Sequence, residues 1–136
     1  MLQMPSPSKR YRVCLLEDDV AVSDALRLSL ERQGYEVTSF GSASDFLVRG
    51  QVDTYDCLVV DQHLPLLSGL ELVELLRRRA YSKPAVLIWG QPVAHLLPRI
   101  RRAAINETLT KPLSPENLVA AVLRAISCPG DSELRT

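Results

Sequence analysis

The sequence has no excess of either charge, since its 136 residues include 16 basic and 16 acidic ones. This balance argues against nucleic-acid binding driven by bulk charge. No apolar stretch approaches the roughly 20 residues that a membrane-spanning helix needs. The polar, Pro- and Ser-rich residues 1–9 lack the apolar segment of a signal peptide. We therefore expect a cytoplasmic protein that binds neither membranes nor nucleic acids.

Cysteine is also scarce, with three residues in the whole chain. Cys14, Cys57 and Cys128 are widely spaced, and the first two lie in apolar runs. Their spacing fits neither a disulfide framework nor a set of metal ligands. We expect buried free thiols in a reducing compartment.

Two short runs of arginine, in residues 77–79 and 99–102, are the only dense positive segments. Both fall near the expected ends of helices, where a positive charge interacts favourably with the helix dipole. We expect them to be solvated helix ends.

Apolar, strand-like runs alternate with segments of helical periodicity along the chain. The expected strands are residues 11–16, 35–40, 57–60, 85–88 and 108–110. The expected helices are residues 20–33, 42–49, 69–79, 96–104 and a last one that starts at Ser114, with buried stripes that include Val22, Leu26 and Leu30 in the first and Leu118, Val122, Ala125 and Ile126 in the last. This alternation predicts an α/β fold with a parallel sheet covered on both faces. We expect one domain over residues 10–127, between flexible tails at 1–9 and 128–136.

Charged residues follow three of the expected strands. Glu17 and Asp18 follow the first, Asp61 follows the third, and Lys111 follows the fifth. In a flavodoxin-like, doubly wound sheet of order 2-1-3-4-5, the ends of strands 1 and 3 are neighbours, and ligands bind there. The long side chain of Lys111 can reach the same edge. The pattern predicts one shared polar site.

Three carboxylates in such a site repel one another and stay ionised only if a cation compensates them. Oxygen ligands of this kind suit Mg²⁺, which keeps several of its waters. Lys111 adds a second positive charge. Fixed positive charge around a carboxylate favours acceptance of a phosphoryl group, because it stabilises the negative charge on the phosphoryl oxygens.

Each of these signals has an ordinary structural reading. An Asp after a strand is usually a turn or cap residue. Glu17, Asp18 and Asp19 could simply open a helix, whose first turn favours acids. Lys111 followed by Pro112 carries little information alone. The three signals on strands 1, 3 and 5 of one fold are stronger together than any one of them.

Three segments resemble the receiver domain of bacterial response regulators: CLLEDD at 14–19, VVDQHLPLLSGLEL at 59–72 and LTKPL at 109–113. The resemblance covers about residues 10–127. The middle segment is the most specific, because Asp61 with Pro65 and Gly69 downstream matches the family's phosphoacceptor loop. The resemblance implies that Asp61 accepts phosphate from a phosphohistidine and that Glu17 and Asp18 hold Mg²⁺.

The resemblance also implies roles for the neighbours of Asp61. The backbone carbonyl of His63 would complete the metal site, and its imidazole would border the site, where it would tune dephosphorylation. Lys111 would pair with Asp61 and then with the phosphoryl oxygens. Lys111 and Pro112 would be joined by a cis peptide bond, which proline permits.

The chain departs from the family pattern at the positions expected to sense phosphate. Trp89 stands where the family has Thr or Ser at the end of strand 4, so the hydroxyl that bonds the phosphoryl group is missing. The N–H of Gly90 remains as a donor. Thr108 replaces the family's Tyr or Phe, and we expect the indole of Trp89 to lie toward it. The alternative is that Trp89 packs on the helix expected at 96–104.

A further departure follows that helix. Ala104 and Ile105 stand where the family has Gly and Ala. Without the glycine, the helix end needs another cap, and Asn106 is the candidate because asparagine tolerates the left-handed conformation.

The resemblance implies a stand-alone signalling protein that takes phosphate from a sensor histidine kinase or a histidine phosphotransfer protein. It would not be an enzyme, apart from slow loss of its own phosphate. Output would come through contact with another protein, and a homodimer could form through the segments at 96–104, 108–110 and 115–126. The alternatives are a pseudo-receiver that phosphate does not switch, a receiver cut from a larger protein, and a small phosphohydrolase with Asp61 as nucleophile.

Overall fold

Five short parallel strands form the centre of the structure, a computed structural model that describes residues 10–127. Both expected tails, and Cys128 with them, lie outside the described residues. The strands are β1 (Arg12–Leu16), β2 (Glu36–Phe40), β3 (Cys57–Asp61), β4 (Ala85–Trp89) and β5 (Glu107–Thr110). Their order is β2-β1-β3-β4-β5, which confirms the predicted flavodoxin-like topology.

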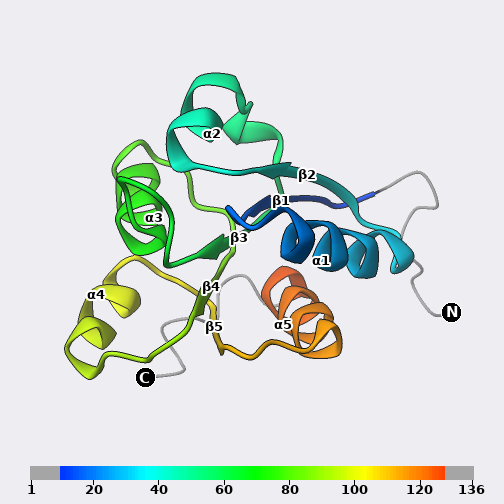
Figure 1. The fold of residues 1–136 in the computed structure, drawn as a ribbon. Coiled ribbons are helices and arrows are strands. Elements are labelled where there is room, and N and C mark those ends of the chain that lie inside the picture. Colours follow the sequence, from blue (N-terminus) through cyan, green and yellow to red (C-terminus); the bar gives the residue numbers. More distant parts are fainter. Residues whose placement is uncertain (1–9, 128–136) are drawn as a thin grey trace, which may run out of the picture.

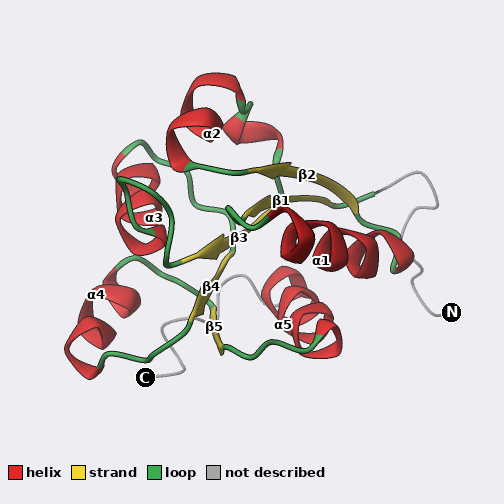
Figure 2. Cartoon of the chain, viewed as in Figure 1, coloured by secondary structure: helices red, strands yellow, loops and turns green. Residues whose placement is uncertain are grey.

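The helices cover both faces of this sheet (Figure 1, Figure 2). They are α1 (Val20–Arg32), α2 (Ala43–Arg49), α3 (Gly69–Arg78), α4 (Leu97–Arg102) and α5 (Pro115–Ser127), with 3-10 turns η1 (Val52–Thr54) and η2 (Ala94–Leu96). Helices α1 and α5 lie on one face, and α2, α3 and α4 lie on the other. No helix within residues 10–127 combines the length and the apolar composition needed to cross a membrane.

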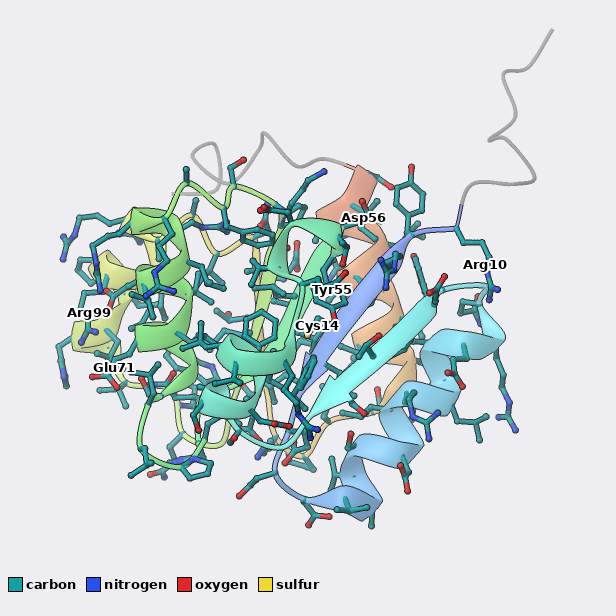
Figure 3. The ribbon with its side chains drawn as sticks, turned by 90° about the horizontal axis from the view of Figure 1, so that it is seen from above. Arg10, Cys14, Tyr55, Asp56, Glu71 and Arg99 are labelled. Carbon is teal, nitrogen blue, oxygen red and sulfur yellow. The ribbon has the colours of Figure 1, made fainter. Side chains whose placement is uncertain are left out.

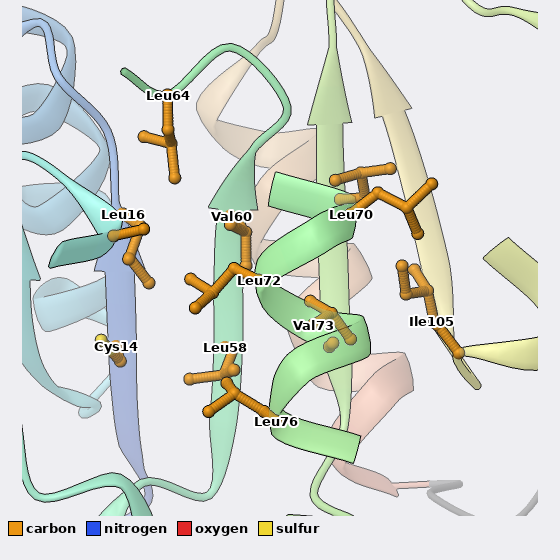
Figure 4. Close-up of a cluster of buried hydrophobic side chains, with 14 of the residues drawn as sticks. Cys14, Leu16, Leu58, Val60, Leu64, Leu70, Leu72, Val73, Leu76 and Ile105 are labelled. Atoms are coloured by element: carbon orange, nitrogen blue, oxygen red, sulfur yellow. The ribbon is translucent and has the colours of Figure 1, made fainter. Parts of the chain in front are cut away.

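Alternating residues of the three central strands, β1, β3 and β4, enter two separate cores, as expected for strands buried on both faces. Val13 and Leu15 of β1 pack with α1 and α5, whereas Cys14 and Leu16 face α2 and α3. Figure 4 shows the second core, where Leu72, Val73 and Leu76 of α3 face Leu58 and Val60 of β3. Cys14 and Cys57 are both buried free thiols, as predicted.

The expected stripe of α1 is only partly correct. Leu26 and Leu30 are buried, but Val22 is 40% exposed and Ser23 is buried in its place. The buried spacing is therefore i, i+3 and i+7 from Ser23, which turns the helix slightly from the predicted orientation. In α5, Leu118, Val122 and Ala125 are buried as predicted, with Ala121, while Ile126 is partly buried.

Three helices end in the same way, with a residue at positive φ after the last turn. Gly34 does this after α1, but Ala80 (φ 69°) and Ala104 (φ 55°) do it after α3 and α4. After α4, the N–H of Ala104 donates to the Arg101 carbonyl and that of Ile105 donates to the Ile100 carbonyl, which is the Schellman pattern. The prediction that Asn106 caps this helix was wrong. Asn106 is buried, and its Oδ1 accepts a hydrogen bond from the N–H of Ala85 at 2.9 Å.

The expectation that both basic runs are solvated is wrong for Arg77, whose side chain is partly buried. Its guanidinium donates to the carbonyls of Ala103 (2.7 Å), Ala104 (3.1 Å), Tyr81 (2.9 Å) and Lys83 (2.8 Å). Burial lowers the pKa of this group, against the influence of Tyr81. Arg77 therefore ties the end of α3 to the end of α4 through backbone carbonyls.

A second contact joins the same two helices. The guanidinium of Arg99 on α4 donates to both oxygens of Glu74 on α3, at 3.0 and 2.7 Å. Figure 3 shows Arg99 on the outer side of α4, beside α3. The hydrogen bond from Arg99 lowers the pKa of Glu74, against a smaller opposing effect of burial. Together with Arg77, this ion pair fixes α4 against α3.

Replacing Arg77 tests the first of these contacts. We expect Arg77→Met to lower the free energy of unfolding by about 2–4 kcal/mol, because it leaves several carbonyls without a charged donor. Urea unfolding followed by circular dichroism measures the change. Arg79→Met, at an exposed arginine of the same run, is the matched control and should change stability by less than about 0.5 kcal/mol. Equal effects of the two substitutions would contradict this role.

Candidate functional site

Asp61 lies at the end of β3 and is almost completely buried, with 1% of its surface exposed. Its Oδ2 accepts a hydrogen bond from Lys111 Nζ at 2.7 Å. Its Oδ1 accepts from the backbone N–H of His63 at 2.9 Å. Each carboxylate oxygen thus has a hydrogen-bond donor, as a buried polar group requires.

The acidic pair from β1 lies beside Asp61. Parallel register places Leu16 opposite Val60, so the residues that follow these strands meet at one edge of the sheet. Glu17, Asp18 and Asp61 each offer a carboxylate oxygen within 4.8 Å of the other two. Glu17 is buried and Asp18 is exposed. This all-oxygen set, open on one side, fits a hard divalent cation such as Mg²⁺.

The electrostatics of the site show the strain of gathering like charges. Burial, and then the side-chain contact with Asp61, raises the pKa of Glu17 to about 7, although Lys111 opposes this. Burial alone would lower the pKa of Lys111, but the hydrogen bond and charge of Asp61 raise it overall. A bound cation would offset the repulsion between Glu17 and Asp61 and so favour the ionised form of Glu17.

Asp19 has the ordinary structural role that we weighed for this acidic run. Its Oδ1 accepts from the N–H of Val22 at 3.1 Å and so caps the start of α1. The N–H of Asp19 in turn donates to Glu17 Oε2 at 3.1 Å. The acidic residues of this run therefore have different roles: Asp19 caps the start of α1, whereas Glu17 and Asp18 face the site.

Gln62, which follows Asp61, and Gly69, which begins α3, support the site in ways that the sequence did not indicate. Gln62 Oε1 accepts from the N–H of Leu70 at 2.8 Å, and the Gln62 carbonyl accepts from the N–H of Gly69 at 3.2 Å. A Cβ at Gly69 would lie 2.6 Å from the Asp61 carbonyl oxygen. The start of α3 packs directly on Asp61, and only glycine allows that approach.

The remaining neighbours of Asp61 partly match expectation. The peptide bond between Lys111 and Pro112 is cis. His63 is exposed, and its N–H bonds Asp61. Its carbonyl as a metal ligand and its imidazole as a modulator stay predictions.

Trp89 is buried, with 4% of its surface exposed, in the cluster that contains Ile100 of α4 and Ala103, which follows that helix. Whether the indole lies toward Thr108 or packs on α4 stays a prediction. Thr108 lies on the same face of the sheet as Trp89, because β5 pairs it with Leu87 and pairs Thr110 with Trp89. Its side chain is exposed. The carbonyl of Trp89 accepts from the N–H of Lys111 at 2.9 Å, so Trp89 adjoins the site through the backbone.

Comparison with known proteins identifies a family. The response regulator receiver domain matches residues 13–123. Nodulation protein W of Bradyrhizobium diazoefficiens is 33% identical over 118 residues, which cover 87% of this chain and 52% of that protein. The transcriptional regulatory protein FixJ of Azorhizobium caulinodans is 32% identical over 110 residues, or 81% of this chain and 52% of that one. The chain therefore spans about half the length of these relatives.

Solved structures agree on the fold. The response regulator StyR superposes with a TM-score of 0.80 and 29% identity, over 93% of this chain and 64% of that one. A CheY-like receiver domain protein of Methanospirillum hungatei gives 0.79 and 21% identity, over 94% of this chain and all of that one. At that lower identity the likeness concerns the fold alone.

The acidic group predicts a measurable cation affinity. We expect Glu17→Gln to weaken Mg²⁺ binding about tenfold or more, because one charged ligand is lost. Isothermal titration calorimetry with MgCl₂ measures the affinity. Glu116→Gln, in the first turn of α5, is the control and should bind Mg²⁺ like the unmodified chain. Unchanged affinity in Glu17→Gln would rule out a site at this group.

Proposed function

The chain belongs to the response regulator receiver domain family, and we propose that it accepts a phosphoryl group on Asp61 from a histidine kinase or a histidine phosphotransfer protein. The observation that carries this proposal is the buried Asp61 carboxylate, bonded to Lys111 and adjacent to Glu17 and Asp18. Receiver domains are signalling modules of two-component systems. The proposed role of this chain in such a system rests on the geometry of this site.

The chemistry is a transfer between two nucleophiles. An oxygen of the Asp61 carboxylate attacks phosphorus, the P–O bond forms, the P–N bond to the donor imidazole breaks, and the imidazole leaves with the electron pair. Mg²⁺ held by Glu17, Asp18, Asp61 and the His63 carbonyl would supply positive charge to the phosphoryl oxygens. Lys111 stays protonated, since its pKa is raised, and exchanges its bond with Asp61 for one with a phosphoryl oxygen.

Output, in this proposal, passes through protein contact. Slow loss of phosphate is the only turnover, so the chain signals and does not process a substrate. The surface of α4, β5 and α5 is the proposed site for a homodimer or an output protein. Gly90 and Thr108 belong to the proposed switch, together with Trp89.

Trp89 also supports a second candidate, a pseudo-receiver whose partners regulate it without phosphate. No hydroxyl stands at this position to bond the phosphoryl group, and the indole is buried in the core between the sheet and helices α2, α3 and α4. A state held by this packing would bind partners without responding to Asp61. The two candidates differ in whether phosphate moves Trp89.

Phosphorylation of Asp61 is tested directly by mass. With Mg²⁺ and acetyl phosphate, we expect intact mass spectrometry to show the gain of one phosphoryl group. Asp61→Asn removes the nucleophile and should show none, while Asp53→Asn, in the turn η1, serves as the control and should behave like the unmodified chain. The absence of any gain, both with acetyl phosphate and with phosphorylated histidine kinases, would refute the proposal.

The fluorescence of Trp89 separates the two candidates, because it is the only tryptophan in the chain. If phosphate switches the protein, the emission should shift in step with the mass gain, since Lys111 contacts both Asp61 and the Trp89 carbonyl. Asp61→Asn is the control and should show no shift with acetyl phosphate. A full mass gain with constant emission would favour the pseudo-receiver.

A further inference from the structure

Leu66, in the loop after Asp61, has a conformation that its side chain does not explain. Its side chain is 99% exposed. Its φ is 70°, in the left-handed region that a γ-branched residue rarely adopts. Single exposed apolar side chains are ordinary on protein surfaces. An exposed leucine on strained backbone is different, because glycine or asparagine would fit the same turn at lower free energy.

The turn around Leu66 is firmly held. The N–H of Leu67 donates to the Pro65 carbonyl at 2.8 Å and closes a three-residue turn centred on Leu66. On one side of it, Leu64 is buried and points into the core (Figure 4). On the other, Gln62 bonds the N–H groups of Gly69 and Leu70. The loop presents Leu66 to solvent in one fixed position.

This position is at the edge of the sheet that carries Asp61. A second exposed apolar residue, Val20, stands at the same edge: it is 73% exposed and begins α1 after the loop with Glu17 and Asp18. Because β1 and β3 are neighbours, both loops flank the carboxylates. Asp61 itself is almost fully buried, so a phosphohistidine on a protein reaches it only if the donor's surface comes down on this edge.

We propose that Leu66, assisted by Val20, is an apolar contact for the histidine-bearing protein that donates phosphate to Asp61. This role of Leu66 rests on the function proposed above. Burial of a leucine side chain against the donor would stabilise the complex. Its fixed turn reduces the conformational entropy lost on binding. A small donor such as acetyl phosphate reaches Asp61 without covering Leu66. Leu66 therefore affects transfer from a protein and not from a small molecule.

The experiment compares two donors on the same variants. Leu66→Gly removes the side chain and suits the positive φ; Leu66→Met keeps an apolar side chain there. Ala80→Gly is the matched control, because Ala80 is also exposed at positive φ but follows α3, away from the site. Each protein is phosphorylated with acetyl phosphate and with purified, autophosphorylated histidine kinases, from a panel screened for transfer to the unmodified chain.

We expect Leu66→Gly to lower kcat/KM for transfer from the kinase about tenfold, mainly through a higher KM, with an unchanged rate from acetyl phosphate. Leu66→Met and Ala80→Gly should resemble the unmodified chain with both donors. The urea midpoint of Leu66→Gly should be unchanged or higher.

The inference is overturned if Leu66→Gly accepts phosphate from the kinase as well as the unmodified chain does, or if it loses the same factor with both donors. It also falls if the unmodified chain takes phosphate from acetyl phosphate but from no kinase of the panel, because the donor class is then wrong. A chain that takes phosphate from neither donor contradicts the proposed function itself.

Discussion

The ion pair between Asp61 and Lys111 is the contact on which the arrangement of the site depends. A carboxylate that is 1% exposed would be strongly destabilising without partners, and Lys111 Nζ at 2.7 Å provides the charge that balances it. Asp61 is the last residue of β3 and Lys111 follows β5, with β4 between the two strands. In this parallel sheet the two strand ends lie at one edge, and the long side chain of Lys111 spans the intervening strand. The fold therefore positions the ion pair.

That balance is incomplete, because Glu17 is also buried in the same place. One lysine faces two buried carboxylates and an exposed one, and the pKa of Glu17 rises to about 7, through burial first and the contact with Asp61 second. A sequence selected for stability alone would not keep this group of charges. Local conflict of this kind, inside a sheet that is otherwise consistently apolar, is typical of a functional site.

The strands and the charged residues at their ends could be predicted from the sequence because both are strong, short-range signals, whereas the strand order was taken from the flavodoxin-like fold that alternating strands and helices suggest. Apolar runs that end in charge locate strand ends, and strand order then gathers Glu17, Asp61 and Lys111. Contacts to backbone carbonyls carry no such signal. Arg77 looked like any basic helix end, because its four carbonyl partners depend on how α3 and α4 approach. Asn106 and Val22 were misassigned for a related reason. A shift by one residue, in a helix cap or in the buried face of a helix, changes which side chain is buried.

The same contacts indicate where α4 has freedom to move. Its C-terminal end is held by Arg77 at the carbonyls of Ala103 and Ala104, and its middle is held by the pair of Glu74 and Arg99. Its start is held less: the preceding turn η2 (Ala94–Leu96) and α4 itself both begin without a side-chain cap. Trp89 enters the cluster beneath α4 from β4, and its carbonyl bonds the Lys111 N–H. Because the side-chain contacts described above fix the middle and the end of α4, we expect the segment from Gly90 to Leu96 to move at a lower cost in free energy than the rest of this face if phosphate displaces Lys111.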